Sequence, residues 1–131
     1  MKRPTDGSPG SDEPYATLDP TAIDELRSLA AGGDVTLLKD VLGTYLRDAA
    51  SYAREIRTAI AESDARKLDR CAHTLKSTSA TVGAMELAEI CKELEQLGRR
   101  GLTSEAASKL DELDRRFSAA LAAVTAELER S

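Results

Sequence analysis

Residues 68–97 read LDRCAHTLKSTSATVGAMELAEICKELEQL, and their apolar pattern decides the fold. Apolar or small residues recur at spacings of three and four on both sides of Gly83, as on the buried face of an amphipathic helix. They are Leu68, Ala72, Leu75, Ser79 and Val82 before the glycine, and Leu87, Ile90, Cys91, Leu94 and Leu97 after it. Gly83 suits the left-handed conformation that commonly closes a helix. The stretch therefore predicts two helices, over about residues 65–82 and 84–99, joined by a tight turn.

A short helix is predicted upstream, where Asp19 and Pro20 are typical of a helix cap and a first helical position. It is expected to reach about Ala31 and to end at the glycine pair at positions 32 and 33. Residues 1–17 are rich in proline, glycine, serine and aspartate, show no periodicity, and are interpreted as a flexible tail. The folded domain is therefore predicted to cover residues 18–131.

Two longer helices complete the pattern. The first is expected to begin after Asp34 and to end at Ser63 and Asp64, and the last is expected to begin at Ser104, with Glu105 in its first turn. Their apolar residues again recur at three- and four-residue spacing: Leu38, Val41, Leu42, Tyr45, Leu46, Tyr52, Ile56 and Ile60 in the first, and Leu110, Leu113, Phe117, Leu121, Val124 and Leu128 in the last. No segment alternates with a period of two. The predicted fold class is all-α, an antiparallel up-down four-helix bundle with an additional short N-terminal helix.

Composition and charge exclude several classes of function. The formal net charge of −5 argues against nucleic acid as a partner. No apolar run is long enough for a membrane span or a signal peptide, so a cytoplasmic protein without a membrane partner is expected. One histidine and two distant cysteines do not form a metal site, and no glycine-rich nucleotide loop is present. Cys71 and Cys91 are expected to pack as free thiols near the core.

The single histidine, His73, is the candidate functional residue. It points about 140° away from the centre of the apolar stripe on its own helix, and is therefore expected to face solvent. An imidazole that titrates near ~6.5 is largely neutral in the cytosol and offers a ring nitrogen as a nucleophile. Lys76 lies on the same side, where its ammonium would lie beside a dianionic group transferred to that nitrogen. Ser77, one turn on, is small enough to leave room for the group.

Residues 72–95, AHTLKSTSATVGAMELAEICKELE, resemble the signature of histidine-containing phosphotransfer (HPt) domains of bacterial phosphorelays. That signature reads A-H-x-L-K-[GS]-x-[AS]-x-x-x-G-A-x-x-L-x-x-x-C-x-x-L-E. The matching residues are Ala72, His73, Leu75, Lys76, Ser77, Ser79, Gly83, Ala84, Leu87, Cys91, Leu94 and Glu95. Many members carry glycine where this chain has Ser77. The resemblance extends over about residues 18–128, because the upstream helices also follow the layout of the family.

The resemblance implies a role for each of three residues. His73 would accept the phosphoryl group, Lys76 would stabilise it, and Ser77 would keep the approach open or donate a hydrogen bond. The chain would be a phosphocarrier without kinase activity that binds no cofactor of its own and acts as a monomer. Its partners would be receiver domains of response regulators or of hybrid sensor histidine kinases, and Mg²⁺ bound in the receiver would assist the transfer.

The bundle also fits an interaction module that carries no phosphate and binds or sequesters a partner protein, since this architecture serves many functions. A substituted His73 or Lys76 would have favoured that hypothesis, and neither is found here. A bundle that both relays phosphate and sequesters another enzyme is a third alternative. Comparing the proteins that bind the wild type and a His73→Ala variant would separate phosphate-dependent from phosphate-independent binding.

Overall fold

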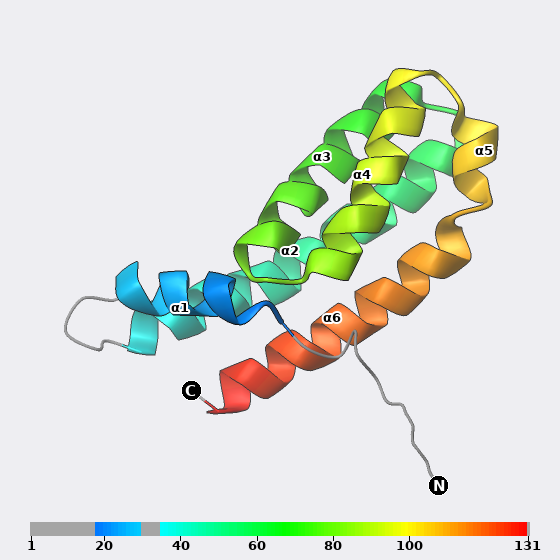
Figure 1. The fold of residues 1–131 in the computed structure, drawn as a ribbon. Helices are drawn as coiled ribbons and strands as arrows, with labels where there is room; N and C mark the ends of the chain where they lie inside the picture. Colours follow the sequence, from blue (N-terminus) through cyan, green and yellow to red (C-terminus); the bar gives the residue numbers. More distant parts are fainter. Residues whose placement is uncertain (1–17, 30–34, 131) are drawn as a thin grey trace, which may run out of the picture.

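The computed structural model describes residues 18–29 and 35–130, which form six α-helices and no strand (Figure 1). The helices are α1 (Pro20–Leu29), α2 (Val35–Ala61), α3 (Ala65–Thr81), α4 (Met85–Arg99), α5 (Thr103–Ala107) and α6 (Leu110–Arg130). The four long helices form a closed ring, because α2 and α4 each pack against both α3 and α6. Successive long helices run in opposite directions (Figure 1). The predicted all-α, up-down four-helix bundle is confirmed. The predicted tail over residues 1–17, the helix end at residues 31–33 and the cap at Asp34 lie outside the described residues.

The core is built from the apolar stripes that the residue spacing predicts. Leu68 and Leu75 of α3 and Leu94 of α4 are completely buried, and Ile56 of α2 is as well. Cys71 and Cys91 are both buried and free, as expected. Burial raises the pKa of the Cys91 thiol to about 12. The core therefore lies between the same helix faces that the sequence marks as apolar.

The short helix α1 covers the end of the bundle that contains the turn between α3 and α4. Ile23 and Leu26 are buried in the common core. The backbone N–H of Asp19 donates to the carbonyl of Gly83 at 2.9 Å. Arg27 forms an ion pair with the buried Glu127 of α6 at 2.5 Å. These contacts join α1 to both α6 and the α3–α4 turn.

Helices α2, α3 and α4 end in the same backbone arrangement, with one residue in the left-handed region. These residues are Ser63 (φ 56°), Gly83 (φ 86°) and Gly101 (φ 72°). After each one, the next N–H bonds back to the carbonyl five residues earlier, from Asp64 to Ala59, Ala84 to Ser79 and Leu102 to Leu97. This hydrogen-bond pattern satisfies carbonyls that a helix end otherwise leaves unpaired. The predicted helix-closing role of Gly83 is confirmed.

The prediction of one continuous last helix beginning at Ser104 is wrong. The chain forms the short helix α5, breaks at Ser108 and Lys109, and starts again as α6. At the break, Ser108 and Lys109 donate to carbonyls only three residues back. Thr103 and Ala106 are buried because α5 packs against α4 and α2 where it crosses the end of the bundle (Figure 1). The axis of α5 runs in a different direction from that of α6. One straight helix therefore cannot make both the contacts of α5 at the end of the bundle and the contacts of α6 along its side.

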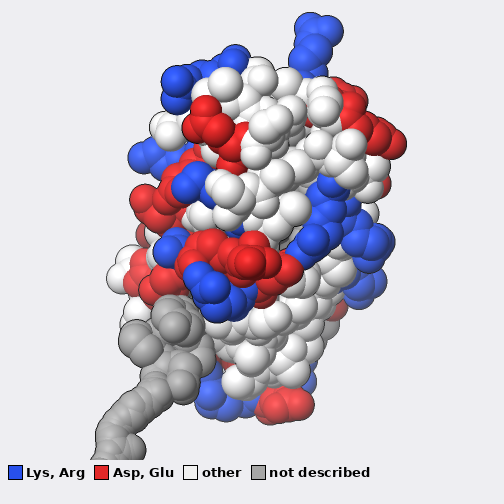
Figure 2. All heavy atoms as spheres, turned by 90° about the vertical axis from the view of Figure 1, so that its right-hand side faces the viewer, with Lys and Arg blue, Asp and Glu red and all other residues white. Residues whose placement is uncertain are grey.

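The surface of the bundle carries charges of both signs. On the face shown in Figure 2, basic and acidic side chains are interspersed and separated by uncharged areas. In the part of the chain that the structure describes, no helix combines the length and the apolar character that a bilayer span requires. The large apolar side chains exposed there are Leu29, Leu37 and Met85.

Gly98 sets the close packing of α4 against α3, and its replacement by alanine is expected to be destabilising. A Cβ there would lie 2.7 Å from the backbone nitrogen of Asp69 and 3.0 Å from the carbonyl oxygen of Ala65. We expect Gly98→Ala to lower the free energy of unfolding by about 1–3 kcal/mol, because the two backbones must move apart. Urea denaturation followed by circular dichroism measures this change.

Gly43→Ala in α2 is the matched control. Its added Cβ would meet nothing closer than the Arg47 side chain at 3.9 Å. Alanine in a helix interior is more favourable than glycine by roughly 0.5–1 kcal/mol, so this variant should be slightly stabilised. Equal stability changes in the two variants would show that Gly98 is not a packing constraint.

Candidate functional site

His73 lies on α3 and faces outward. Its side chain is 55% exposed, whereas its neighbour Ala72 and the nearby Leu75 are completely buried. The outward direction agrees with the prediction from the helical periodicity. The imidazole therefore stays on a helix whose opposite face is fixed in the core.

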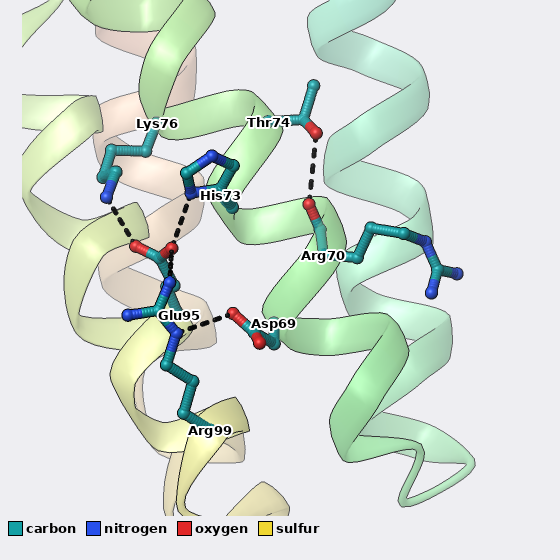
Figure 3. Close-up of polar contacts among 7 residues, drawn as sticks. All are labelled: Asp69, Arg70, His73, Thr74, Lys76, Glu95 and Arg99. Atoms are coloured by element: carbon teal, nitrogen blue, oxygen red, sulfur yellow. Dashed lines mark hydrogen bonds and ion pairs between the residues drawn. The ribbon is translucent and has the colours of Figure 1, made fainter.

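A buried carboxylate of α4 binds the inner side of this imidazole (Figure 3). The Glu95 side chain is only 2% exposed, and its Oε2 lies 2.6 Å from Nδ1 of His73. Its Oε1 accepts a hydrogen bond from Nζ of Lys76, also at 2.6 Å. Arg99 donates to Oε2 at 2.7 Å and reaches Asp69 of α3 through Nε at 3.3 Å. One carboxylate thus connects the histidine, the lysine and an arginine across two helices.

The contact with Glu95 assigns different roles to the two ring nitrogens of His73. An ionised carboxylate only accepts hydrogen bonds, so Nδ1 must be the nitrogen that carries the proton. In the neutral ring, Nε2 then holds the free lone pair. Nε2 points away from Glu95 in the close-up (Figure 3). The geometry therefore presents a single nucleophilic nitrogen on the outer side of the ring.

Glu95 is held in its ionised form. Burial is the largest influence on this side chain and by itself raises the pKa. Hydrogen bonds from Lys76 and His73 lower it, and so do the charges of Lys76 and Arg99. The net result is a pKa of Glu95 below its ordinary value of 4.5. At neutral pH the site therefore contains a buried negative charge directly behind the imidazole.

This pKa direction predicts how stability depends on pH. A carboxyl whose pKa is lower in the folded chain stabilises the fold above its unfolded pKa, and the contribution is lost as the pH falls through the folded pKa. We expect the difference in free energy of unfolding between the wild type and Glu95→Gln to be largest near pH 7. It should shrink as the pH falls below about 4.5. Urea denaturation at pH 7, 4 and 3 measures it, and a difference that is constant over this range would contradict the prediction.

The other two predicted site residues lie on the same helix as His73. Lys76 is 30% exposed and its ammonium contacts Glu95, an ion pair that the sequence reasoning did not include. Ser77 is exposed, and its carbonyl accepts a hydrogen bond from Thr81. All three residues therefore border the outer face of α3, and Lys76 and His73 share one acceptor.

Glu95 is the residue that the sequence reasoning missed. It matches the final position of the quoted signature, but no role was assigned to it. A signal was present, because Glu95 follows the buried Cys91 by four residues and so falls on the apolar side of α4. An acid at such a position requires buried partners, and the structure supplies them. Within residues 18–29 and 35–130, no group of three or more histidine, cysteine, aspartate or glutamate side chains is placed to hold a metal ion.

Comparison with known proteins identifies the family. The model of the Hpt domain matches residues 40–130. Among solved structures, histidine-containing phosphotransfer protein B (HptB) from Pseudomonas aeruginosa PAO1 superimposes with a TM-score of 0.80 and 28% sequence identity, over 92% of this chain and 99% of that chain. None of the curated proteins matches the chain. Since the matched region covers more than half of the sequence and contains both α3 and α4, the chain belongs to the Hpt domain family.

Proposed function

We propose that the chain is a phosphorelay intermediate that accepts a phosphoryl group on Nε2 of His73 and passes it on. The donor is an aspartyl phosphate of one receiver domain, and the acceptor is an aspartate of another. The observation that carries the proposal is the exposed imidazole whose Nδ1 is held by the buried Glu95 carboxylate. Membership of the Hpt domain family supports a phosphotransfer role.

The transfer needs little from this chain beyond position and charge. The Nε2 lone pair attacks phosphorus in line, the N–P bond forms, and the bond to the aspartate oxygen breaks with its electron pair leaving on the carboxylate. The imidazole ring gains positive charge during this step. Glu95, bound to Nδ1–H, balances that charge, and its fixed position costs no reorganisation. Glu95 is thus a positioning residue, which acts through His73. The second transfer is the reverse reaction onto the next aspartate.

Lys76 is proposed to stabilise the phosphoryl group and Ser77 to support its approach. An ammonium has three N–H donors, so the bond from Lys76 to Glu95 leaves donors for phosphoryl oxygens. Ser77 adds little bulk to the exposed face one turn after the histidine. We assign the lysine a charge-neutralising role and the serine a steric one.

We further propose that the chain works as a monomeric, cytoplasmic phosphocarrier without kinase activity of its own. Its folded domain covers residues 18–131 and its partners are receiver domains of response regulators or hybrid sensor histidine kinases. The chain binds no cofactor, and the Mg²⁺ that assists the transfer belongs to the receiver. The acidic net charge of −5 supports a protein partner in preference to nucleic acid.

Incubation with ³²P-labelled receiver domains tests the proposal. The panel should contain the receivers of the source organism, each phosphorylated on its aspartate before the chain is added. We expect label to move to the chain in a form that survives base and is lost in acid, as for an N–P bond. If binding to a receiver is measured but no receiver transfers label, the chain is a binding module and the phosphorelay role is wrong.

A further inference from the structure

A groove lies between α1 and the last turns of α6, at the end of the bundle that α1 covers (Figure 1). It has a volume of about 410 Å³. Ile23 of α1 and Ala123 of α6 are buried and give it an apolar lining, together with the partly exposed Ala126. Because α3 and α6 are on opposite sides of the four-helix ring, the groove lies away from the outer face of α3.

Two arginines border the groove, and each keeps donors for an occupant. Arg27 and Arg130 each donate through Nη2 to the buried Glu127 carboxylate, at 2.5 and 2.6 Å. The Asp24 carboxylate approaches Nη1 of Arg27 only to 3.9 Å and is mostly exposed. A guanidinium has five N–H donors, so these contacts leave several unused. Since both arginine side chains are more than half exposed, the groove offers basic donors at its open edge.

The chain enters the groove from its own N-terminal side. Leu18 is the first residue that the structure describes, and it lines the groove while packing against the core. The next residue, Asp19, is fixed by its backbone hydrogen bond to Gly83. The segment before Leu18 is therefore tethered at the groove. A short tether gives an effective concentration in the millimolar range, so weak contacts are enough for binding.

The sequence of that segment is complementary to the groove. Residues 11–17 read SDEPYAT, and Tyr15 is the single aromatic residue within residues 1–17. Three residues of extended chain span about 10 Å, so the Tyr15 ring is within reach of the apolar lining. Asp12 and Glu13 come shortly before the tyrosine and supply two carboxylates for the arginines at the edge.

We propose that residues 12–17 bind in this groove of their own chain. Tyr15 contacts the apolar lining, and the carboxylates of Asp12 and Glu13 accept hydrogen bonds from the two arginines. In this arrangement the segment connects α1 to α6 a second time, beside the ion pair of Arg27 with Glu127. It also closes this end of the bundle to other proteins. The proposal is independent of the phosphorelay function, because the groove lies away from the face that carries His73.

NMR spectroscopy of the full chain tests the proposal. We expect nuclear Overhauser contacts between the ring protons of Tyr15 and the methyl groups of Ile23 and Ala126. Tyr15→Phe should keep these contacts, because the apolar ring makes them. Tyr15→Ser should shift the methyl signals of the groove. If the Tyr15 ring shows no such contacts and Tyr15→Ser leaves the methyl signals unchanged, the proposal is wrong.

Charge reversal tests the contacts with the arginines. The ratio of bound to free segment, measured from the Ala126 methyl shift, should fall by about 3-fold or more in Glu13→Lys, because an attraction becomes a repulsion. Asp6→Lys is the matched control, since it makes the same charge change seven residues further from the groove. It should change the ratio by less than about 1.5-fold at physiological salt.

A compensating variant identifies the partner of the acidic residues. Arg130→Glu should lower the ratio as Glu13→Lys does, and the two substitutions together should restore it. Equal effects of Glu13→Lys and Asp6→Lys, with no recovery in the double variant, would overturn the charge pairing. Groove signals that change with protein concentration would show that the segment enters a second copy, which would overturn binding within one chain.

Discussion

His73→Gln is expected to abolish phosphoryl transfer to the chain while leaving its fold unchanged. A glutamine amide nitrogen has no nucleophilic lone pair, so the N–P bond does not form. The side chain is more than half exposed, so the substitution opens no cavity in the core. Incubation with the labelled receiver measures the transfer, and circular dichroism with urea denaturation measures the fold.

Arg66→Gln is a suitable control, because Arg66 is exposed on the same side of α3, two turns before the histidine. It should accept label like the wild type. If His73→Gln still accepts label, another residue is the phosphoryl acceptor and the assignment of His73 is wrong. Loss of both label and helical signal would show only that the variant unfolds, and His73→Asn would then be measured in its place.

Glu95→Gln is expected to slow transfer by about 10- to 100-fold, the loss found when the partner that orients a metal-ligating histidine is replaced. Glutamine has nearly the same shape, so it still accepts a hydrogen bond from Nδ1. It carries no negative charge to balance the developing positive charge on the ring. Its amide N–H₂ group also has to lie beside the ammonium of Lys76 or the guanidinium of Arg99, where it has no acceptor.

A control variant and an NMR measurement distinguish the positioning of His73 by Glu95 from a general effect of Glu95 on the stability of the fold. Glu93→Gln removes a partly exposed carboxylate of the same helix, which pairs with Lys109, and should leave transfer nearly unchanged. ¹⁵N NMR of His73 should show the proton on Nδ1 in the wild type and a mixture of the two neutral tautomers in Glu95→Gln. If the rate falls while the Nδ1–H tautomer stays dominant, Glu95 contributes charge alone and does not select the tautomer.

Much of the fold is predictable from the sequence, because residue spacing and turn residues within each short segment indicate where a helix lies and where it ends. The stripes of Leu68 to Val82 and of Leu87 to Leu97 are visible as spacings, and Gly83 supplies the left-handed residue at the turn. The break at Ser108 between α5 and α6 was not predicted, because no glycine or proline between Ser104 and Leu110 marks the end of a helix. The buried contacts of α5 at the end of the bundle impose that break, and those with α2 join residues far apart in the sequence.

The sequence by itself determined the outward direction of His73, since one helix and its apolar stripe are sufficient for that. Only the tertiary structure decided what lies behind the ring. Glu95 follows His73 by 22 residues on another helix, and the closed packing of α3 against α4, which Gly98 permits, brings its carboxylate to Nδ1. The spacing of apolar residues predicts which face of a helix is buried, but it does not predict which residues of another helix pack against that face. The pairing of Lys76 and the choice of Nε2 as the free nitrogen therefore depend on contacts between helices.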